Sequence, residues 1–119
     1  FMKKFLKPKI LLLGLSYKKN IEDTRESASI KIFEKIKAKG FYIDFCDPYN
    51  TKFKFNLKNK NITINSKKFT SKLLRKYNII ILSTDHDKFN YKIIKNSKKL
   101  IIDLRGKFKK IKAKNIYQL

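Results

Sequence analysis

The segment from residue 10 to residue 27, ILLLGLSYKKNIEDTRES, joins an apolar run to residues that could bind a charged small molecule. Three of the nine acids of the chain and one of its three arginines lie together here: Glu22, Asp23, Arg25 and Glu26. The chain has 31 lysines and arginines but only nine acids, so composition alone does not explain why three acids lie together in this segment. Mixed charges in the loop after a buried strand are typical of a nucleotide site, in which lysine and arginine donate hydrogen bonds to phosphate.

The other acids also gather at the ends of apolar runs. Asp47 follows the second run, Asp85 and Asp87 follow the third, and Asp103 lies in the last. Seven of the nine acids therefore stand at or just after such ends. In open α/β sheets, ligands bind beyond the carboxyl ends of the strands, so we expect function at this edge.

Apolar runs alternate with amphipathic segments along the whole chain. Strands are predicted at residues 9–15, 41–48, 78–84 and 99–106, with a short one at 61–65 inside a Lys/Asn-rich loop of residues 49–68. Helices are predicted at 27–40, 69–77 and 88–99, and residues 107–119 are left unassigned. This alternation predicts a three-layer, doubly wound, Rossmann-like α/β fold with a mainly parallel sheet, as a single domain over residues 1–119.

The first predicted helix has clear boundary signals. Ile32, Phe33 and Ile36 share one face, and Gly40 is placed to end the helix. Asp23 and Glu26 stand three apart just before it, which predicts a capping box.

Four segments together resemble the C-terminal, UDP-binding domain of the UDP-glucose/GDP-mannose dehydrogenase family. They are LGLSYKKNIEDTRES, FCDPYN, STDHDKF and IIDLRG, in this order, and they span most of residues 9–105. The TDHD form is most similar to the UDP-N-acetylhexosamine 6-dehydrogenases of bacterial surface-polysaccharide synthesis. The resemblance implies that the whole enzyme oxidises the sugar C6 hydroxyl to a carboxylate in two NAD-dependent steps, through a thioester on a cysteine. This domain would supply contacts to the nucleotide sugar.

The resemblance also implies roles for single residues. Tyr17 and Lys18 match the family's aromatic–lysine pair at the nucleotide sugar, and Arg105 matches an arginine that contacts the same ligand. A lysine after a buried strand can donate a charged hydrogen bond to a diphosphate, worth about 1.5–3 kcal/mol. For Arg105, a plain surface position is the alternative.

Arg25 has two open interpretations. It matches the family's arginine that reaches toward the NAD bound by the partner domain. It could equally form a helix-start ion pair with Glu22 or Asp23.

Other residues in the matching segments are given structural roles. Asp47 and Pro48 are expected to form the turn that closes the second strand. His86 lies between two acids, but a single histidine lacks the converging spacing of a metal site, so a loop or domain-contact role is expected. Cys46 lies at a strand end, where buried thiols are common, and outside the family's Gly-rich nucleophile motif. We therefore assign no catalytic and no metal-ligating residue.

The glycine content argues against a dinucleotide site in this chain. Only Gly14, Gly40 and Gly106 occur, so no G-x-G-x-x-G loop is possible. NAD is therefore expected only through missing NAD-binding and central domains, present in cis or in trans. The resemblance begins close to residue 1 and Phe1 precedes Met2, which favours a detached C-terminal domain, inactive as a dehydrogenase on its own.

The net charge of +22 leaves a second class of function open. A strongly basic surface can bind nucleic acid or another polyanion, although here the positive residues are mostly lysine and are spread over the chain. A polyanion-binding module and a gene fragment without selected activity are therefore kept as alternatives, and non-specific polyanion binding is expected at low salt. No run approaches the roughly 18–20 apolar residues of a membrane span, and a single cysteine suits a reducing compartment, so we expect a cytoplasmic location without a membrane partner.

Overall fold

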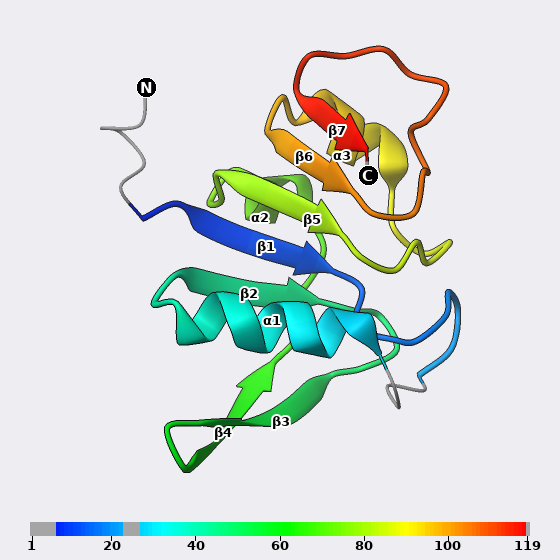
Figure 1. Ribbon diagram of the computed structural model, residues 1–119. Coiled ribbons are helices and arrows are strands. Elements are labelled where there is room, and N and C mark those ends of the chain that lie inside the picture. Colours follow the sequence, from blue (N-terminus) through cyan, green and yellow to red (C-terminus); the bar gives the residue numbers. More distant parts are fainter. Residues whose placement is uncertain (1–6, 23–26, 119) are drawn as a thin grey trace.

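The computed structural model describes residues 7–22 and 27–118. Its centre is a five-stranded sheet with the order β2-β1-β5-β6-β7, in which every neighbouring pair is parallel (Figure 1). The strands are β1 (Lys9–Leu13), β2 (Tyr42–Cys46), β5 (Ile79–Leu82), β6 (Leu100–Asp103) and β7 (Ile116–Gln118). The predicted doubly wound fold with a mainly parallel sheet is confirmed. Because the chain places β2 on one side of β1 and then β5 on the other, a topological switch point lies between β1 and β5.

Helices cover both faces of this sheet. α1 (Ala28–Ala38) lies over one face, and the shorter α2 (Ser71–Leu74) and α3 (Tyr91–Asn96) lie over the other (Figure 1). The arrangement follows from β1, where Ile10 and Leu12 pack on the α1 side while Leu11 and Leu13 pack on the α2 and α3 side. A strand buried on both faces needs a continuous apolar run, and this is why β1 could be predicted from the sequence.

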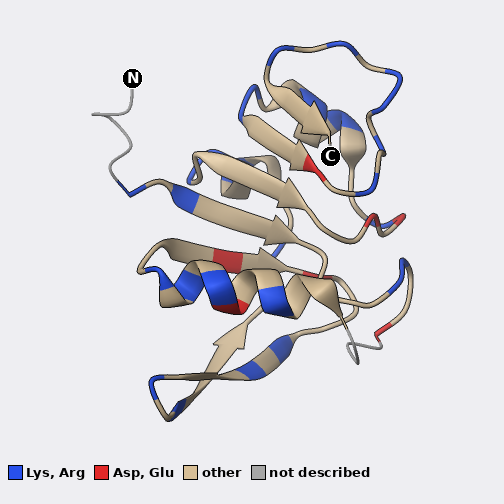
Figure 2. Cartoon of the chain, in the orientation of Figure 1, with Lys and Arg blue, Asp and Glu red and all other residues tan. Residues whose placement is uncertain are grey.

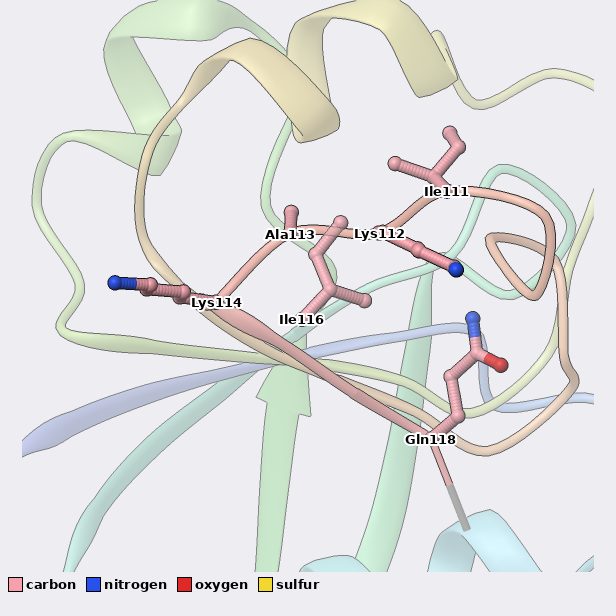
Figure 3. A pocket seen from close by; sticks show the side chains of 6 residues that line it. All are labelled: Ile111, Lys112, Ala113, Lys114, Ile116 and Gln118. Atoms are coloured by element: carbon pink, nitrogen blue, oxygen red, sulfur yellow. The ribbon is translucent and has the colours of Figure 1, made fainter.

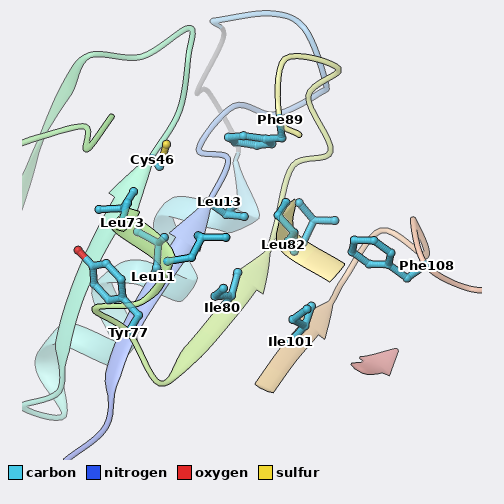
Figure 4. Packing of buried hydrophobic residues seen from close by; sticks show 12 residues of the cluster. Leu11, Leu13, Cys46, Leu73, Tyr77, Ile80, Leu82, Phe89, Ile101 and Phe108 are labelled. Atoms are coloured by element: carbon cyan, nitrogen blue, oxygen red, sulfur yellow. The ribbon is translucent and has the colours of Figure 1, made fainter. Parts of the chain in front are cut away.

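The apolar cluster on the α2 and α3 side continues into the C-terminal segment. Figure 4 shows Leu11, Ile80 and Ile101 from three adjacent strands in one cluster, with Leu73 of α2 near Leu11 and Phe108 beyond β6 near Ile101. All of these side chains are buried. The unassigned tail therefore belongs to the core, and it also contributes β7.

The start of α1 differs from the prediction. The cap is Ser27, whose hydroxyl accepts the N–H of Ser29 at 3.2 Å, so the expected capping box of Asp23 and Glu26 was wrong. A serine directly before the first helical residue satisfies an orphan N–H of the first turn. Asp23 and Glu26 themselves lie outside the described residues.

Residues 49–68, expected to be a loop with one short strand, are largely a β-hairpin. β3 (Lys52–Leu57) and β4 (Lys60–Asn65) pair antiparallel across Lys58 and Asn59, which have φ angles of 51° and 65°. Two successive positive φ values make a tight hairpin turn that usually contains glycine, and the Lys-Asn pair hid this signal. The hairpin turns an apolar face toward α1 (Figure 1).

The two later helices are shorter than predicted. Asn90 caps α3 by accepting the N–H of Ile93, so Phe89, expected inside the helix, lies before it.

Among the described residues, no helix is long and apolar enough to cross a membrane.

Candidate functional site

The chain leaves β1 in close contact with the end of β5. Gly14 has a φ of +92°, and a Cβ built on it would lie 2.4 Å from the Cβ of Thr84 and 2.5 Å from the Thr84 carbonyl oxygen. Only glycine fits this conformation and this approach. The loops after β1 and β5 are thereby brought side by side at the switch point.

Asp47, the first residue after β2, holds the beginning of the β1 loop. Its Oδ2 accepts the backbone N–H of Leu15 at 2.6 Å and that of Ser16 at 3.2 Å. Its Oδ1 accepts the N–H groups of Tyr49 at 2.7 Å and Asn50 at 3.2 Å, which confirms the predicted turn. The same carboxylate therefore closes its own turn and anchors a loop more than thirty residues away in the chain, which sequence reasoning missed.

His86 holds the end of the same loop. The Asn20 N–H donates to Nδ1 of His86 at 2.7 Å, and Nε2 of His86 lies 3.0 Å from Oδ2 of Asp47. Both side chains are fully or almost fully buried. Burial alone would raise the pKa of the Asp47 carboxyl, but hydrogen bonds from His86 and from backbone N–H groups outweigh burial and lower that pKa.

Arg105 connects the loop after β6 to the loops after β1 and β5. Its N–H donates to Asp103 at 3.0 Å, while its side-chain Nε donates to the Ser83 carbonyl at 2.7 Å and its Nη2 to the Tyr17 carbonyl at 3.2 Å. These two side-chain bonds leave Nη1 without a partner among the described residues. The guanidinium is exposed and is fixed in place by two carbonyls.

A hollow of about 310 Å³ lies beneath this arginine. Its lining comes from the β1, β5 and β6 loops and from the first turns of α1, namely Tyr17, Ala28, Ser29, Ile32, Ser83, Leu104 and Arg105. The hydroxyls of Ser29 and Ser83 are hydrogen bonded to each other, and the Nζ of Lys18 lies 5.7 Å from the centre of the Tyr17 ring. Two cationic side chains, an aromatic ring and two hydroxyls suit a ligand with both phosphate and sugar groups.

The structure brings two of the four residues expected at the site together, because Tyr17 and Arg105 line one hollow. Lys18 follows Tyr17 in the chain, and its Nζ lies near the Tyr17 ring. Arg25 lies outside the described residues. Ser29 and Ser83 were missed, and the available signal was their position, since Ser83 begins a matching segment and Ser29 lies two residues after another.

A larger hollow lies elsewhere, outside the matching segments. It measures about 470 Å³ and is lined by one stretch of chain around β7. Figure 3 shows its walls as the side chains of Ile111, Ala113 and Ile116 and the stems of Lys112 and Lys114, with Gln118 at one end. None of these residues belongs to the matching segments, so size does not make this hollow the better candidate.

Cys46 ends β2 as a buried thiol. Burial raises its pKa to about 12, and the nearby Asp47 charge adds to the effect. A thiol with so high a pKa is almost entirely protonated at neutral pH.

Comparison with known proteins identifies the domain. The model of the UDP-glucose/GDP-mannose dehydrogenase family, UDP binding domain, matches residues 11–110. The chain belongs to this family. The match runs from β1 past Arg105, so this UDP binding domain contains Tyr17, Lys18 and Arg105 within the family region.

The curated relatives are much longer proteins. The UDP binding domain is 33% identical over 111 residues to a UDP-N-acetyl-D-mannosamine dehydrogenase of Methanococcus vannielii, covering 84% of this chain and 23% of that protein. It is 34% identical over 97 residues to a protein of the same name from Methanococcus maripaludis, covering 82% and 19%. The chain thus spans less than a quarter of the curated relatives it matches.

Two solved structures share the fold over nearly the whole chain. A UDP-D-ManNAc dehydrogenase from Pyrococcus horikoshii superposes with a TM-score of 0.69 at 24% identity, covering 98% of this chain and 27% of that chain. A GDP-mannose dehydrogenase from Pseudomonas aeruginosa superposes with a TM-score of 0.70 at 17% identity, covering 98% and 29%. At these identities the likeness establishes the fold.

Proposed function

We propose that the hollow between β1, β5 and β6 binds the UDP portion of a UDP-N-acetylhexosamine. Lys18 and Arg105 would donate to the diphosphate, with Tyr17 as support. The observation that carries this proposal is the bond from Arg105 to the Tyr17 carbonyl, which joins two motifs 88 residues apart at the switch point. The family match and the names of the relatives support the ligand class.

In the whole enzyme, this chain would be the nucleotide-sugar-binding domain, over residues 1–119, of an NAD-dependent UDP-sugar 6-dehydrogenase. The overall reaction would take the C6 alcohol to a carboxylate, with four electrons passing to two NAD⁺ and water supplying the second carboxylate oxygen. The NAD-binding and central domains, in cis or in trans, would carry that chemistry. Arg25 is proposed to reach the NAD held by them.

The described part of this chain does not fit NAD itself. Doubly wound folds bind a dinucleotide diphosphate with free backbone N–H groups of the loop after the first strand and of the next helix start. Here the N–H groups of Leu15 and Ser16 already donate to Asp47, and that of Ser29 donates to Ser27. These three N–H groups are therefore already occupied, and we propose that they bind no NAD diphosphate.

The positive surface must be separated from the specific site. Lys and Arg are distributed over helices, strands and loops, whereas acids are few (Figure 2). Such a surface attracts any polyanion at low salt, with an affinity that falls steeply as salt rises. A specific UDP-sugar site should instead depend on two named cations at physiological salt.

The test is a calorimetric titration of the purified chain with UDP-N-acetylmannosamine at about 150 mM salt. Two charged hydrogen bonds of about 1.5–3 kcal/mol each predict that Lys18→Ala/Arg105→Ala loses at least about 100-fold in affinity. The matched control is Lys112→Ala/Lys114→Ala, which removes the same charge beside the other hollow and should bind like the wild type. Equal weakening of both double variants would instead support the polyanion alternative, and an absence of saturable binding would overturn the proposal.

A further inference from the structure

The segment that carries Tyr17 and Lys18 is exposed, yet it is held at both ends by one buried pair. Leu15 and Ser16, before it, donate to Asp47. Asn20, its last residue, donates to His86, and His86 is in turn hydrogen bonded to Asp47. The two buried groups therefore act together on a four-residue loop, residues 17–20.

The hydrogen bonds determine the tautomer of His86. A peptide N–H can only donate, so Nδ1 of His86, 2.7 Å from the Asn20 nitrogen, must be the bare acceptor. The proton is then on Nε2, which faces Oδ2 of Asp47 at 3.0 Å. The ring is neutral in this arrangement, because a proton on Nδ1 would face the Asn20 N–H.

The surroundings fix the position of the ring. His86 has no exposed surface, and its ring lies 4.8 Å from the Tyr49 ring and 5.6 Å from the Phe89 ring, centre to centre. Next to it, the Asn20 side chain donates to Asp87 at 2.7 Å and accepts the Asp87 N–H at 2.8 Å. Asn20 has a φ of +64°, a conformation that asparagine tolerates better than most residues.

We propose that His86 is a positioning residue for the nucleotide-sugar site: its bare Nδ1 holds the Asn20 N–H and thereby fixes the Tyr17 and Lys18 segment against the Arg105 side. The inference rests on the proposed function for its ligand, but the positioning itself is a property of this chain. His86 touches no ligand group in this proposal. It acts through the backbone of Asn20.

A pair of substitutions separates the two ring nitrogens. In His86→Asn, the amide oxygen can take the place of Nδ1 and accept from Asn20, but the donor to Asp47 is lost. In His86→Gln, the longer amide can donate to Asp47, but the Asn20 N–H loses its acceptor. If Nδ1 is the positioning atom, His86→Gln should weaken UDP-N-acetylmannosamine binding about tenfold or more and His86→Asn by no more than about threefold, because one hydrogen bond is at stake.

Hydrogen exchange and NMR make the outcome independent of the ligand. The Asn20 amide should be protected in the wild type and in His86→Asn, and should exchange much faster in His86→Gln, while the β1 and β5 amides stay protected in all three. The ring of wild-type His86 should show a protonated Nε2 and a bare Nδ1. A protonated Nδ1, or equal behaviour of the two variants in binding and exchange, would overturn the proposal. If the wild type binds no UDP-sugar but the Asn20 amide exchanges as expected in the three proteins, the proposed function is wrong and the positioning of residues 17–20 by His86 is still supported.

Discussion

The loops at the carboxyl edge of the sheet and the β3–β4 hairpin both adjoin β2, but different forces hold them. The loops are joined by hydrogen bonds to buried polar groups, with Asp47 accepting from several segments. The hairpin packs through phenylalanine rings, with Phe33 of α1 lying 5.1 Å from Phe53 and 5.4 Å from Phe55 between ring centres. Apolar packing tolerates small shifts, whereas buried hydrogen bonds fix atoms in place. Buried hydrogen bonds therefore suit loops that must hold a ligand in one position.

The hairpin side is expected to show the largest loss of stability. Phe33 is fully buried and contacts rings from β2 and β3, so Phe33→Ala should lower the free energy of unfolding by about 3–5 kcal/mol. Phe33→Leu, which keeps most of the apolar volume, should cost less than about 1.5 kcal/mol. Urea unfolding measures both, and hydrogen exchange should show the hairpin amides opening before those of the β1 loop. A loss below about 1 kcal/mol for the alanine variant would mean that the rings do not hold the hairpin.

The hydrogen-bonded loops at the carboxyl edge of the sheet should lose stability when Asp47 is replaced by asparagine, which keeps the shape of the side chain and replaces one carboxylate oxygen by an amide nitrogen. Asp47→Asn turns an oxygen that accepts several donors into an amide that opposes them, so about 2–4 kcal/mol of unfolding free energy should be lost. The control is Asp44→Asn in β2, where the carboxylate accepts from the hydroxyl of Tyr77 and about 1 kcal/mol is expected. Similar losses in both would show that the convergence of donors on Asp47 adds nothing.

The same variant has a pH signature. The pKa of Asp47 is lowered in the folded protein, so its ionised form stabilises the fold above the unfolded-state pKa of about 3.9. That stability is lost as the pH falls through the folded-state pKa. The gap between wild type and Asp47→Asn should therefore be full at neutral pH and narrow below about pH 4. A gap that persists in acid would indicate lost packing and not lost charge.

The contrast between these regions also explains what could be predicted from sequence. β1 and β5 could be predicted because parallel strands buried on both faces need continuous apolar runs. Tyr17, Lys18 and Arg105 were predicted from motif segments, and the structure places Tyr17 and Arg105 at the same hollow. The hairpin was missed because its turn contains no glycine.

The buried pair of Asp47 and His86 could not be predicted in the same way. The two residues are 39 positions apart, and no periodic pattern relates them. Asp47 was interpreted as a turn residue and His86 as a loop residue, and each assignment describes one contact of several. Polar contacts between distant loops depend on the topology of the sheet, so they become visible only when the strands are placed.

Gly14, which follows β1, and Gly40, which follows α1, offer a matched pair of substitutions with different surroundings. Gly14 and Gly40 have nearly the same φ, +92° and +88°, but a Cβ on Gly14 would meet Thr84 while a Cβ on Gly40 would meet nothing within 4 Å. Gly40→Ala should thus cost only the left-handed conformation, about 1 kcal/mol, and Gly14→Ala about 2–3 kcal/mol because the backbone after β5 must also move. Since Ser83 and Thr84 would shift with it, Gly14→Ala should additionally weaken UDP-sugar binding, whereas Gly40→Ala should leave binding unchanged. Thermal unfolding and calorimetry measure the two effects separately, and equal costs without a binding change would show that the close approach of β1 and β5 does not set the geometry of the site.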